Sequence, residues 1–386
     1  MRNYFNIMLA TLLVFLSFQL SLSKELTKSV KETDDSVPKN IVIMIGDGMG
    51  IGAITGYYYS NTNANISKFK NIALMTTHPE GALVTDSAAG GTALATGFKT
   101  KNGYISKLPN NSDLETIMEI GKKKGKATGI VVTSTITHAT PAVFYSHVSS
   151  RGNESEIATF ITNQTIDVFF GGGLSFLTAT VNEKYYKEEN SYTTIEVTNQ
   201  LNLLHIMKEL DYKIITNYDD FYSYNPISFE KVLCILEPMH LPPAVSGNRK
   251  ASLANMTEKA LNLLSKSKNG FVLMIEGSQI DWEAHGNNAK GLLAEIHDFD
   301  EAVGVVINFA KKRNDTLVIV TSDHETGGVS IIGGVVGKHS VIRFLSKDHT
   351  ANIVPLFSYG PSSEKFTGFI DNTYVGKLLI DLLSKQ

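Results

Sequence analysis

Three apolar runs of this sequence each lead into side chains that can ligate a metal ion. The runs and the residues that follow them are Ile41–Ile45 before Asp47, Phe271–Ile275 before Glu276, and Leu317–Ser322 before Asp323 and His324. If these runs are strands of one open α/β sheet, their carboxyl ends lie at the edge where such sheets bind ligands. Carboxylates that converge there repel one another and are costly to bury unless cations neutralise them. A single Asp before Gly, such as Asp47, is usually part of a turn or a helix cap. The metal hypothesis therefore rests on the occurrence of such residues after all three runs.

A fourth segment adds a second kind of metal ligand. Asp281 and His285 form a D-x-x-x-H pair, and residues four apart share one face of a helical turn. Carboxylate plus imidazole is a normal zinc ligand set, although such a pair is by itself more often a surface contact. Glu276 precedes Asp281 by only five residues, so one loop can supply two metal sites.

Ser87 is a candidate nucleophile because of the small residues around it. It lies in Val84–Ala93, where Ala and Gly leave room for the close approach of a substrate. If a helix begins here, its amide groups and dipole favour a bound phosphate and a serine alkoxide. The alternative is that Ser87 or Asp86 only caps that helix. This segment alone leaves both interpretations open.

The elements that must position these residues alternate along the chain. Short Val/Ile/Leu/Phe runs are typical of strands buried on both faces, and helical patterns lie between them. The predicted strands are Ile41–Ile45, Thr128–Val132, Asp167–Phe170, Lys213–Thr216, Val232–Leu236, Phe271–Ile275, Thr316–Thr321 and Ile353–Ser358. The predicted helices are Thr92–Thr96, Leu114–Lys124, Glu154–Asn163, Leu253–Lys266, Leu292–Lys312 and Val375–Leu383. This order predicts an α/β fold with a doubly wound, mainly parallel central sheet and helices on both faces.

Composition sets broad limits on the class of protein. The chain has 386 residues and 42% hydrophobic content, which is enough for one large domain. With 35 Lys and Arg against 38 Asp and Glu, nothing points to nucleic acid or an anionic membrane as a partner. The polar stretch 178–224 is a possible accessory region. The single cysteine, Cys234, lies in an apolar run and is expected to be a buried small hydrophobe.

The first residues have the pattern of a secretory signal. Arg2 supplies a positive charge, Ile7–Leu20 is an interrupted apolar run, and Ser21–Ser23 are residues of the kind read at a cleavage site. The run is short for a transmembrane anchor, which is the alternative. We therefore expect a signal peptide over 1–23, a flexible segment over 24–39, a catalytic domain over 40–386, and export to the periplasm or medium without a stable membrane anchor.

Taken together, seven ordered segments from about residue 40 onward resemble the alkaline phosphatase family. They are Asp47–Gly50, Val84–Thr96, Thr137–Ala142, His147–Gly152, Glu276–His285, Thr321–Gly328, and His349–Thr350 ahead of Tyr359–Pro361. The resemblance implies a zinc-dependent phosphomonoesterase that forms a phosphoserine at Ser87. It also implies small phosphate monoesters as substrates and a possible homodimer, although the short segment between His324 and His349 weakens the expectation of a dimer.

The resemblance implies a role for each motif residue. Arg151 is expected to clamp the phosphate with its planar fork, and two zinc ions and one magnesium ion are the expected cofactors. The implied ligand sets are Asp281, His285 and His349 for the first zinc, Asp47, Asp323 and His324 for the second, and Asp47, Thr140 and Glu276 for the magnesium. His339 competes with His349, but the Thr350 and the Tyr-Gly-Pro turn that follow favour His349.

Two residues depart from common family patterns. Many relatives carry Asp where this chain has His138, and Lys or His where it has Trp282. Magnesium prefers oxygen ligands, so the identity of the third ion is open. His138 binds that ion directly, lies one water away, or only forms local hydrogen bonds. Trp282 places an apolar ring where a cation could contact phosphate, and we expect weaker phosphate binding.

Three rival interpretations are weaker. A sulfatase needs a modified cysteine or serine in a C/S-x-P-x-R setting, which the residues after Ser87 lack. A diesterase usually carries Thr as the nucleophile and lacks the motif around Arg151. A silent phosphate- or metal-binding export protein has no need of the serine. Turnover of p-nitrophenyl phosphate, compared with the sulfate and the diester, separates all of these.

Overall fold

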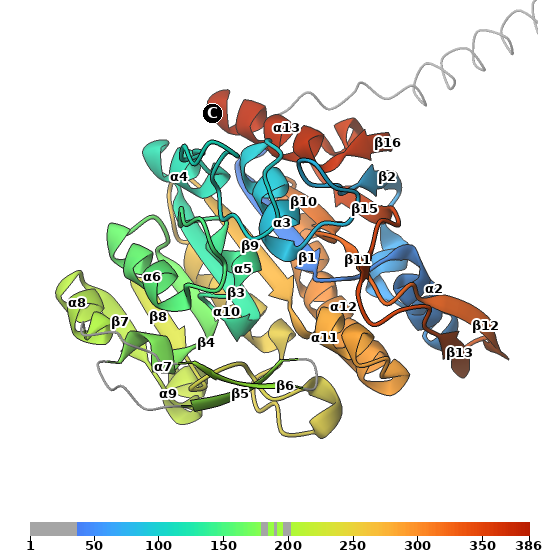
Figure 1. The fold of residues 1–386 in the computed structure, drawn as a ribbon. Coiled ribbons are helices and arrows are strands. Elements are labelled where there is room, and N and C mark those ends of the chain that lie inside the picture. Colours follow the sequence, from blue (N-terminus) through green and yellow to red (C-terminus); the bar gives the residue numbers. More distant parts are fainter. Residues whose placement is uncertain (1–36, 179–183, 189–190, 196–201) are drawn as a thin grey trace, which may run out of the picture. The chain divides into compact units, whose positions relative to one another are not determined.

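A ten-stranded sheet runs through the computed structural model, which describes residues 37–178, 184–188, 191–195 and 202–386 (Figure 1). Its strand order is β16-β2-β15-β10-β1-β9-β3-β4-β8-β7. The strands are β1 (Asn40–Gly46), β2 (Asn71–Thr76), β3 (Ala127–Thr135), β4 (Val168–Gly172), β7 (Tyr212–Ile215), β8 (Lys231–Ile235), β9 (Phe271–Gly277), β10 (Thr316–Thr321), β15 (Val354–Tyr359) and β16 (Gly368–Asp371). Only β15 pairs antiparallel with its neighbours, β10 and β2, so the sheet is mainly parallel.

The central strands are apolar on both faces because helices cover both faces. In β1, Ile41 and Ile43 belong to one hydrophobic cluster and Val42 and Met44 to the other. This alternation is the period of two that a strand imposes on its side chains. A continuous apolar run is therefore what a strand in this position requires.

The helices divide between these two clusters (Figure 1). Helices on the first face are α3 (Ser87–Thr96), α4 (Ile117–Lys123), α5 (Ala139–Ala142), α6 (Glu154–Thr159), α7 (Leu174–Leu177), α8 (Leu203–Glu209) and α13 (Asn372–Ser384). Helices on the second face are α2 (Ile51–Ser60), α9 (Tyr218–Ser223), α10 (Leu253–Leu264), α11 (Gln279–His285) and α12 (Ala289–Arg313). The 3₁₀ turns are η1 (Asn65–Lys68), η2 (Phe160–Asn163), η3 (Ala244–Ser246) and η4 (Ser363–Lys365).

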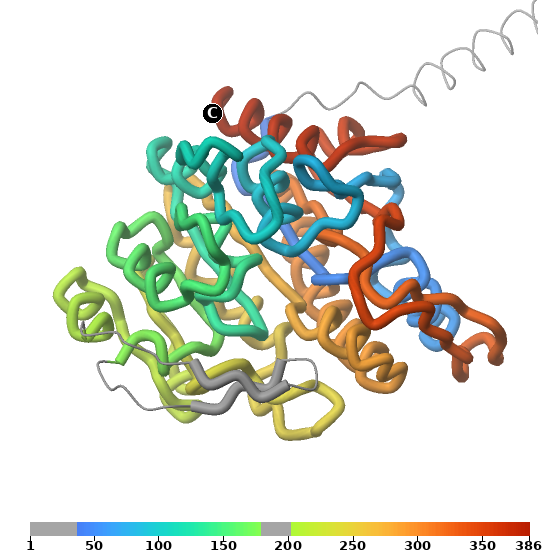
Figure 2. Tube along the Cα trace, viewed as in Figure 1, coloured from blue at the N-terminus to red at the C-terminus, as the bar shows by residue number. Residues whose placement is uncertain are grey.

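The sheet brings together segments that are far apart in the sequence. Strand β1 lies between β9 and β10, and Ile45 is in register with both Glu276 and Thr321. Figure 2 shows the blue start of the described chain beside its orange and red end, and the Gln386 side-chain amide donates to the Pro38 carbonyl oxygen at 2.6 Å. The carboxyl ends of β1, β9 and β10 therefore meet at one edge.

Three small antiparallel pairs lie outside the main sheet. They are β5 (Lys184–Glu188) with β6 (Ser191–Ile195), β11 (Glu325–Thr326) with β14 (His349–Thr350), and β12 (Ser330–Val335) with β13 (His339–Arg343). The second of these pairs matters for function because it carries His349. Within the described ranges, no helix combines the length and the apolar character needed to cross a bilayer.

The predicted fold class is confirmed: the chain forms a doubly wound, mainly parallel sheet in a single domain. All eight predicted strands belong to that sheet, while the edge strand β16 and its neighbour β2 were not predicted. The helix expected at Thr92–Thr96 begins earlier, at Ser87. In the possible accessory stretch 178–224, β7 pairs with β8 at the edge of the main sheet. The predicted signal peptide and most of the flexible segment that follows it lie outside the described residues.

Candidate active site

Three neighbouring strands deliver buried acids to one edge of the sheet. Asp47 follows β1, Glu276 lies near the end of β9, and Asp323 follows β10, all with no solvent exposure. The turn after β1 depends on Gly48, whose φ of +68° is left-handed. A Cβ on Gly48 would lie 2.8 Å from Asp281 Oδ1, so only glycine lets this backbone pass so close to the acids.

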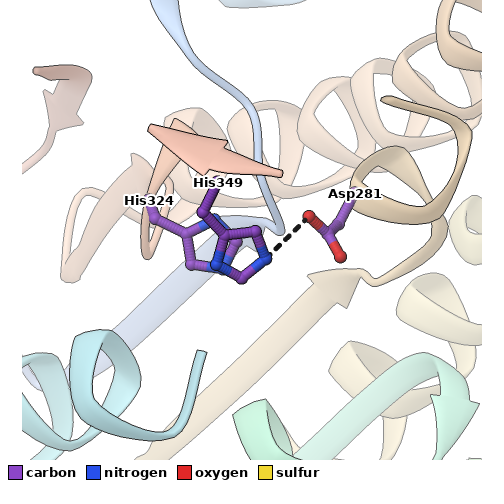
Figure 3. A group of neighbouring side chains, drawn as sticks. All are labelled: Asp281, His324 and His349. Atoms are coloured by element: carbon purple, nitrogen blue, oxygen red, sulfur yellow. Dashed lines mark ion pairs between the residues drawn. The ribbon is translucent and has the colours of Figure 1, made fainter. Parts of the chain in front are cut away.

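The candidate ligands form three overlapping groups whose ligand atoms lie within 4.8 Å of one another. The groups are Asp281 with His324 and His349, Asp47 with Asp323 and His324, and Asp47 with His138 and Glu276. Figure 3 shows His324 and His349 stacked together with Asp281 turned toward them. Asp47 and His324 each belong to two groups, so the three form one continuous cluster. The expected second zinc set, Asp47 with Asp323 and His324, is one of these groups.

His285 adjoins the first group from α11. Its Nε2 lies 3.2 Å from Asp281 Oδ2, because residues four apart on a helix share a face. The same nitrogen lies 3.1 Å from His349 Nε2. His349 Nε2 is in turn 3.5 Å from Asp281 Oδ1. The three expected ligands of the first zinc are therefore mutual neighbours, whereas the competing His339 is exposed on β13.

Several buried polar atoms of this cluster have no hydrogen-bond partner among the described residues, which leaves them available to metal ions. Five of the eight buried side-chain atoms without a hydrogen-bond partner among the described residues belong to it. They are Asp47 Oδ1, His138 Nδ1, Glu276 Oε1, Glu276 Oε2 and Asp323 Oδ2. Buried polar atoms are normally satisfied, and an unpaired buried charge is costly. Carboxylate oxygens and imidazole nitrogens are ordinary ligands of zinc, so the residues present suit the ions that the sequence predicted.

The acids perturb one another strongly. Burial, reinforced by the charges of Asp323, Asp281 and Glu276, holds the pKa of Asp47 well above its usual range. Burial likewise raises the pKa of Glu276 to about 8 and that of Asp323 to about 6. Clusters of titratable groups with such shifts are typical of functional sites. Divalent cations would neutralise these carboxylates and reverse the shifts.

Asp281 and His324 show the opposite tendency. Burial acts to raise the pKa of Asp281, but the hydrogen bond from His285 and the neighbouring imidazoles hold it well below its usual range. Burial lowers the pKa of His324 well below normal, with the nearby His349 adding to the effect. Asp281 is therefore a carboxylate and His324 a neutral imidazole, which are the forms that bind metals.

Hydrogen bonds to carbonyl and hydroxyl groups orient two of the imidazoles. His349 Nδ1 donates to the Thr85 carbonyl oxygen at 2.8 Å, which leaves its Nε2 lone pair toward Asp281. The Thr326 hydroxyl donates to Asp281 Oδ1 and therefore accepts from His324 Nδ1, which lies 3.2 Å away. His324 Nε2 is then the free base facing the acids. Such partners fix the tautomer and the orientation of metal-binding histidines.

Ser87 begins α3 beside this cluster. Its Oγ is 3.2 Å from His324 Nε2, and the side chain is 1% exposed. Asp86 is the N-cap, accepting from the Ala89 amide at 2.9 Å. Helix α3 lies very close to the end of β10, since a Cβ on Gly90 would be 2.6 Å from the Asp323 carbonyl oxygen. The small residues after Ser87 thus bring its hydroxyl to the metal ligands.

Arg151 contacts the Asp86 oxygen that does not cap α3. Arg151 Nη1 is 3.3 Å from Asp86 Oδ2, which also accepts from the Gly103 amide at 2.8 Å. The Arg151 amide donates to the Gly103 carbonyl oxygen at 2.8 Å. Asp86 therefore has two roles: it caps the helix that carries Ser87, and it holds a guanidinium near that serine.

The remaining expected residues lie around the third group. Thr140 on α5 donates to Asp47 Oδ2 at 3.4 Å. His138 immediately precedes α5, and its ring lies edge-on to Trp282 at a centroid distance of 5.7 Å. Trp282 comes from α11, next to Asp281. His138 and Trp282 are therefore neighbours. The two residues that depart from the common family pattern lie at the same place in the site.

Three contributing residues were given no role in the sequence analysis. Thr326 bridges Asp281 and His324, and the Glu325 carboxylate accepts from the Thr350 hydroxyl, which tethers the strand carrying His349. Thr326 and Glu325 lie in the motif Thr321–Gly328, so their position in the sequence could have identified them as site residues. His240, whose ring lies 4.3 Å from Trp282, falls outside every motif.

This fold and this cluster define a metal-dependent hydrolase of the α/β class. The sequence model of one family, described as "Alkaline phosphatase", matches residues 38–342. Alkaline phosphatase 4 of Bacillus subtilis is 31% identical over 92% of this chain and 91% of its own, and the Escherichia coli alkaline phosphatase is 30% identical over 91% and 88%. The chain belongs to the alkaline phosphatase family, whose members hydrolyse phosphate monoesters with the help of metal ions.

Solved structures agree with this assignment. The alkaline phosphatase from the Antarctic bacterium TAB5 superposes with a TM-score of 0.81 at 37% identity, covering 91% of this chain and all of that one. Two variants of that enzyme, in which a histidine is replaced by aspartate or glutamate, have magnesium bound in a site called M3.

Proposed function

We propose that this protein hydrolyses phosphate monoesters through a covalent phosphoserine at Ser87, formed between two zinc ions. The observation that carries the proposal is the placement of the Ser87 hydroxyl, 3.2 Å from His324 Nε2 and beside buried acids, four of whose oxygens lack a hydrogen-bond partner among the described residues. A binding protein would not need a nucleophile at this point. An activated nucleophile beside metal ligands is what covalent phosphoryl transfer requires.

The proposed ligand sets are those that the family resemblance implies, and the three observed groups share most of their residues, with His324 in place of His285 and His138 in place of Thr140. Asp281, His285 and His349 would hold the first zinc; Asp47, Asp323 and His324 would hold the second; Asp47, Thr140 and Glu276, with His138 beside them, would surround the third ion. When bound, a zinc pair activates a serine or water oxygen and neutralises charge on the entering and leaving oxygens of an in-line displacement. Thr326 and the Thr85 carbonyl would keep His324 and His349 oriented toward these positions.

The chain's own residues carry the two displacements. Ser87 Oγ loses its proton to water and forms a bond to phosphorus while the bond from phosphorus to the alcohol oxygen breaks, and the alcohol oxygen takes up a proton from water. Water then attacks the phosphoserine, which restores the Ser87 hydroxyl and releases inorganic phosphate. The first turn of α3 favours negative charge on Ser87 Oγ through its helix dipole. Each step proceeds with the serine held in a buried position.

Arg151 would orient the phosphoryl group. A guanidinium presents two parallel N–H groups to two phosphate oxygens, which Lys cannot do. Asp86 contacts only Nη1 of Arg151, so the rest of the fork stays available to substrate. Because recognition is limited to the phosphoryl group, small monoesters of many alcohols would be accepted.

The third ion would lie beside Asp47, Glu276 and His138, whose ligand atoms form one group. The TAB5 variants with magnesium at M3 carry an acid in place of a histidine, and here His138 Nδ1 is buried beside Asp47 and Glu276. We propose that His138 borders the third site and disfavours magnesium, which prefers oxygen ligands. His138→Asp should then raise magnesium affinity, measured by calorimetry, and unchanged affinity would contradict this role.

Export and assembly remain predictions. The pattern of residues 1–23 supports a signal peptide and release to the periplasm or medium, and that segment lies outside the described residues. N-terminal sequencing of the mature protein checks its removal. The homodimer suggested by the family resemblance is checked by sedimentation velocity.

One assay series tests the proposed reaction. Purified protein loaded with zinc and magnesium should turn over p-nitrophenyl phosphate far faster than p-nitrophenyl sulfate or bis-p-nitrophenyl phosphate. Acid quenching during turnover should leave phosphate on Ser87, located by peptide mass spectrometry, and Ser87→Ala should abolish both signals. Phosphate found on another residue, or none with full activity, would contradict the mechanism.

A further inference from the structure

His240 is an imidazole that neither the metal groups nor the family motifs include, yet it contacts the site. It lies between β8 and η3, and its ring is 4.3 Å from that of Trp282, at an interplanar angle of 59°. It also lies 5.9 Å from the His138 ring, at 90°. The rings of His138, Trp282 and His240 therefore form one packed group beside the third metal group.

A backbone hydrogen bond fixes the His240 ring. The Thr135 amide, at the end of β3, donates to His240 Nδ1 at 2.9 Å. Nδ1 is therefore the unprotonated nitrogen, and the ring plane is set by the strand that leads to His138. Because Trp282 comes from α11, His240 connects the end of β3 to the helix that carries Asp281 and His285.

The loop that carries His240 is itself held firmly. Gln279 Nε2 donates to the carbonyl oxygens of Leu241, at 2.7 Å, and Thr133, at 3.0 Å. Farther along, Arg249 is buried between Glu295 and Asp298 of α12, at 2.9 and 2.7 Å. An anchored loop can hold an aromatic ring in one place, whereas a mobile loop cannot.

We propose that His240 is a positioning residue that holds the Trp282 ring against His138 and so shapes the phosphate-binding side of the site. This rests on the proposed function and on the expectation that Trp282, where many relatives carry Lys or His, faces the bound phosphate, with His138 beside it at the third metal site. An aromatic pair favours its packed arrangement by about twofold to tenfold over unpaired arrangements. Loss of the His240 ring should therefore weaken phosphate binding by a similar factor and leave bond breaking at Ser87 little changed.

Two substitutions separate the ring packing of His240 from its hydrogen bond with the Thr135 amide. His240→Asn keeps an acceptor for the Thr135 amide but removes the ring, while His240→Phe keeps the ring but removes the acceptor. In the zinc- and magnesium-loaded enzyme, His240→Asn should raise the KM for p-nitrophenyl phosphate and the inhibition constant for inorganic phosphate by about twofold to tenfold, with kcat within about twofold. His240→Phe should stay closer to the unmodified protein. His205→Asn, on the exposed side of α8, is the matched control.

Trp282 supplies a readout that does not need activity. It is the single tryptophan of the chain, so intrinsic tryptophan emission reports only this ring. His240→Asn should shift that emission to longer wavelength and lower its anisotropy, and titration with inorganic phosphate should change it less. His205→Asn should change neither emission nor KM. Failure of the protein to turn over any monoester would refute the proposed function and still leave the emission comparison to judge His240.

Two outcomes would overturn the role of His240. The first is a folded His240→Asn variant, with a native circular dichroism spectrum, whose emission and KM equal those of the unmodified protein. The second is an equal effect of Asn and Phe, since the ring would then not be what holds Trp282. A double-mutant cycle with Trp282→Ala sharpens the test: His240→Asn should have no further effect in that background. If His240→Asn does not fold, His240→Gln takes its place with the same criteria.

Discussion

Two groups of buried charge in this molecule differ in whether the protein itself satisfies them. Arg249 donates to both oxygens of Glu295 and to Asp298 Oδ2, all within 2.9 Å. Glu295 also accepts from the Ala244 amide. At the sheet edge, Asp47, Glu276 and Asp323 are just as buried, but several of their oxygens lack a hydrogen-bond partner among the described residues.

This difference indicates that the two groups of buried charge have different roles. Burying charge is costly unless a partner compensates it, and a guanidinium bonded to two carboxylates does so without outside help. The acids at the sheet edge have no comparable arrangement, and their own charges add to the rise in pKa that burial causes, whereas Arg249 opposes the rise that burial causes at Glu295. The first group is complete as the chain folds, while the second is complete only with cations bound.

Metal removal should have the largest effect and should act on only one of the two groups. Exhaustive chelation is expected to reduce turnover of p-nitrophenyl phosphate to background and to lower Tm, because ions bound only by the native state stabilise it. Added zinc with magnesium should restore both. Elemental analysis verifies that the metal has been removed. Activity that survives in metal-free protein would contradict the view that the sheet-edge acids, unlike the Arg249 group, need cations.

Single substitutions should separate activity from stability. Ser87→Ala should lower kcat by roughly 10³-fold or more, since the step through that oxygen is lost, with little change in Tm. Arg249→Met should leave kcat close to normal but reduce the free energy of unfolding by about 3–5 kcal/mol, because two carboxylates lose their buried partner. Steady-state kinetics and urea unfolding measure the two effects; the reverse pattern would show that the groups have been misassigned.

Removing one acid from each group should change stability in opposite directions. In the metal-free protein, Asp47→Asn should raise the free energy of unfolding by about 1 kcal/mol, since it relieves repulsion among buried carboxylates. Glu295→Gln should lower it by about 1–3 kcal/mol, since Arg249 loses a charged acceptor. Urea titration in the presence of a chelator tests both, and a loss of stability in both variants would argue that the sheet-edge acids are satisfied without ions.

The smallest expected effect is the contribution of the buried Lys126 ammonium group to the pH dependence of the free energy of unfolding. Burial, with the charge of Lys39 adding to it, lowers the pKa of Lys126 to about 8, and its Nζ donates to the carbonyl oxygens of Lys39 and Asn269. Between pH 8 and 10.5 the unfolded chain binds more protons at this residue, so its contribution to stability rises with pH. The rise should be on the order of 1 kcal/mol because solvent screens part of the shift. Subtracting the pH profile of Lys126→Met should reveal it; identical profiles would contradict it.

The parts of the fold that could be predicted are those with a strong local pattern. The runs that became β1, β9 and β10 are apolar throughout because both faces are covered, and the motif residues follow directly. Strand β2 was missed although Ile72–Met75 is an apolar run, because so short a run does not distinguish a strand from a buried turn of helix. β16 is only four residues long and starts at Gly368.

The parts of the site that could not be predicted depend on contacts between distant segments. The Thr85 carbonyl orients His349 across 264 residues, and His240 meets Trp282 only because the loop after β8 and helix α11 lie at the same end of the sheet. No spacing rule relates such residues. A capping role for Ser87 or Asp86 was one of the two interpretations left open by the sequence, but the contact of Asp86 with Arg151 required the fold.

Anomalous scattering at the zinc edge, from crystals of the loaded protein, decides whether the unsatisfied acids are a metal centre. Two zinc peaks are expected, one among Asp281, His285 and His349 and one among Asp47, Asp323 and His324, each about 2.0–2.2 Å from its ligand atoms. Zinc found elsewhere, or no zinc at these residues in an active crystal, would contradict metal binding as the reason why several oxygens of these acids lack a hydrogen-bond partner among the described residues.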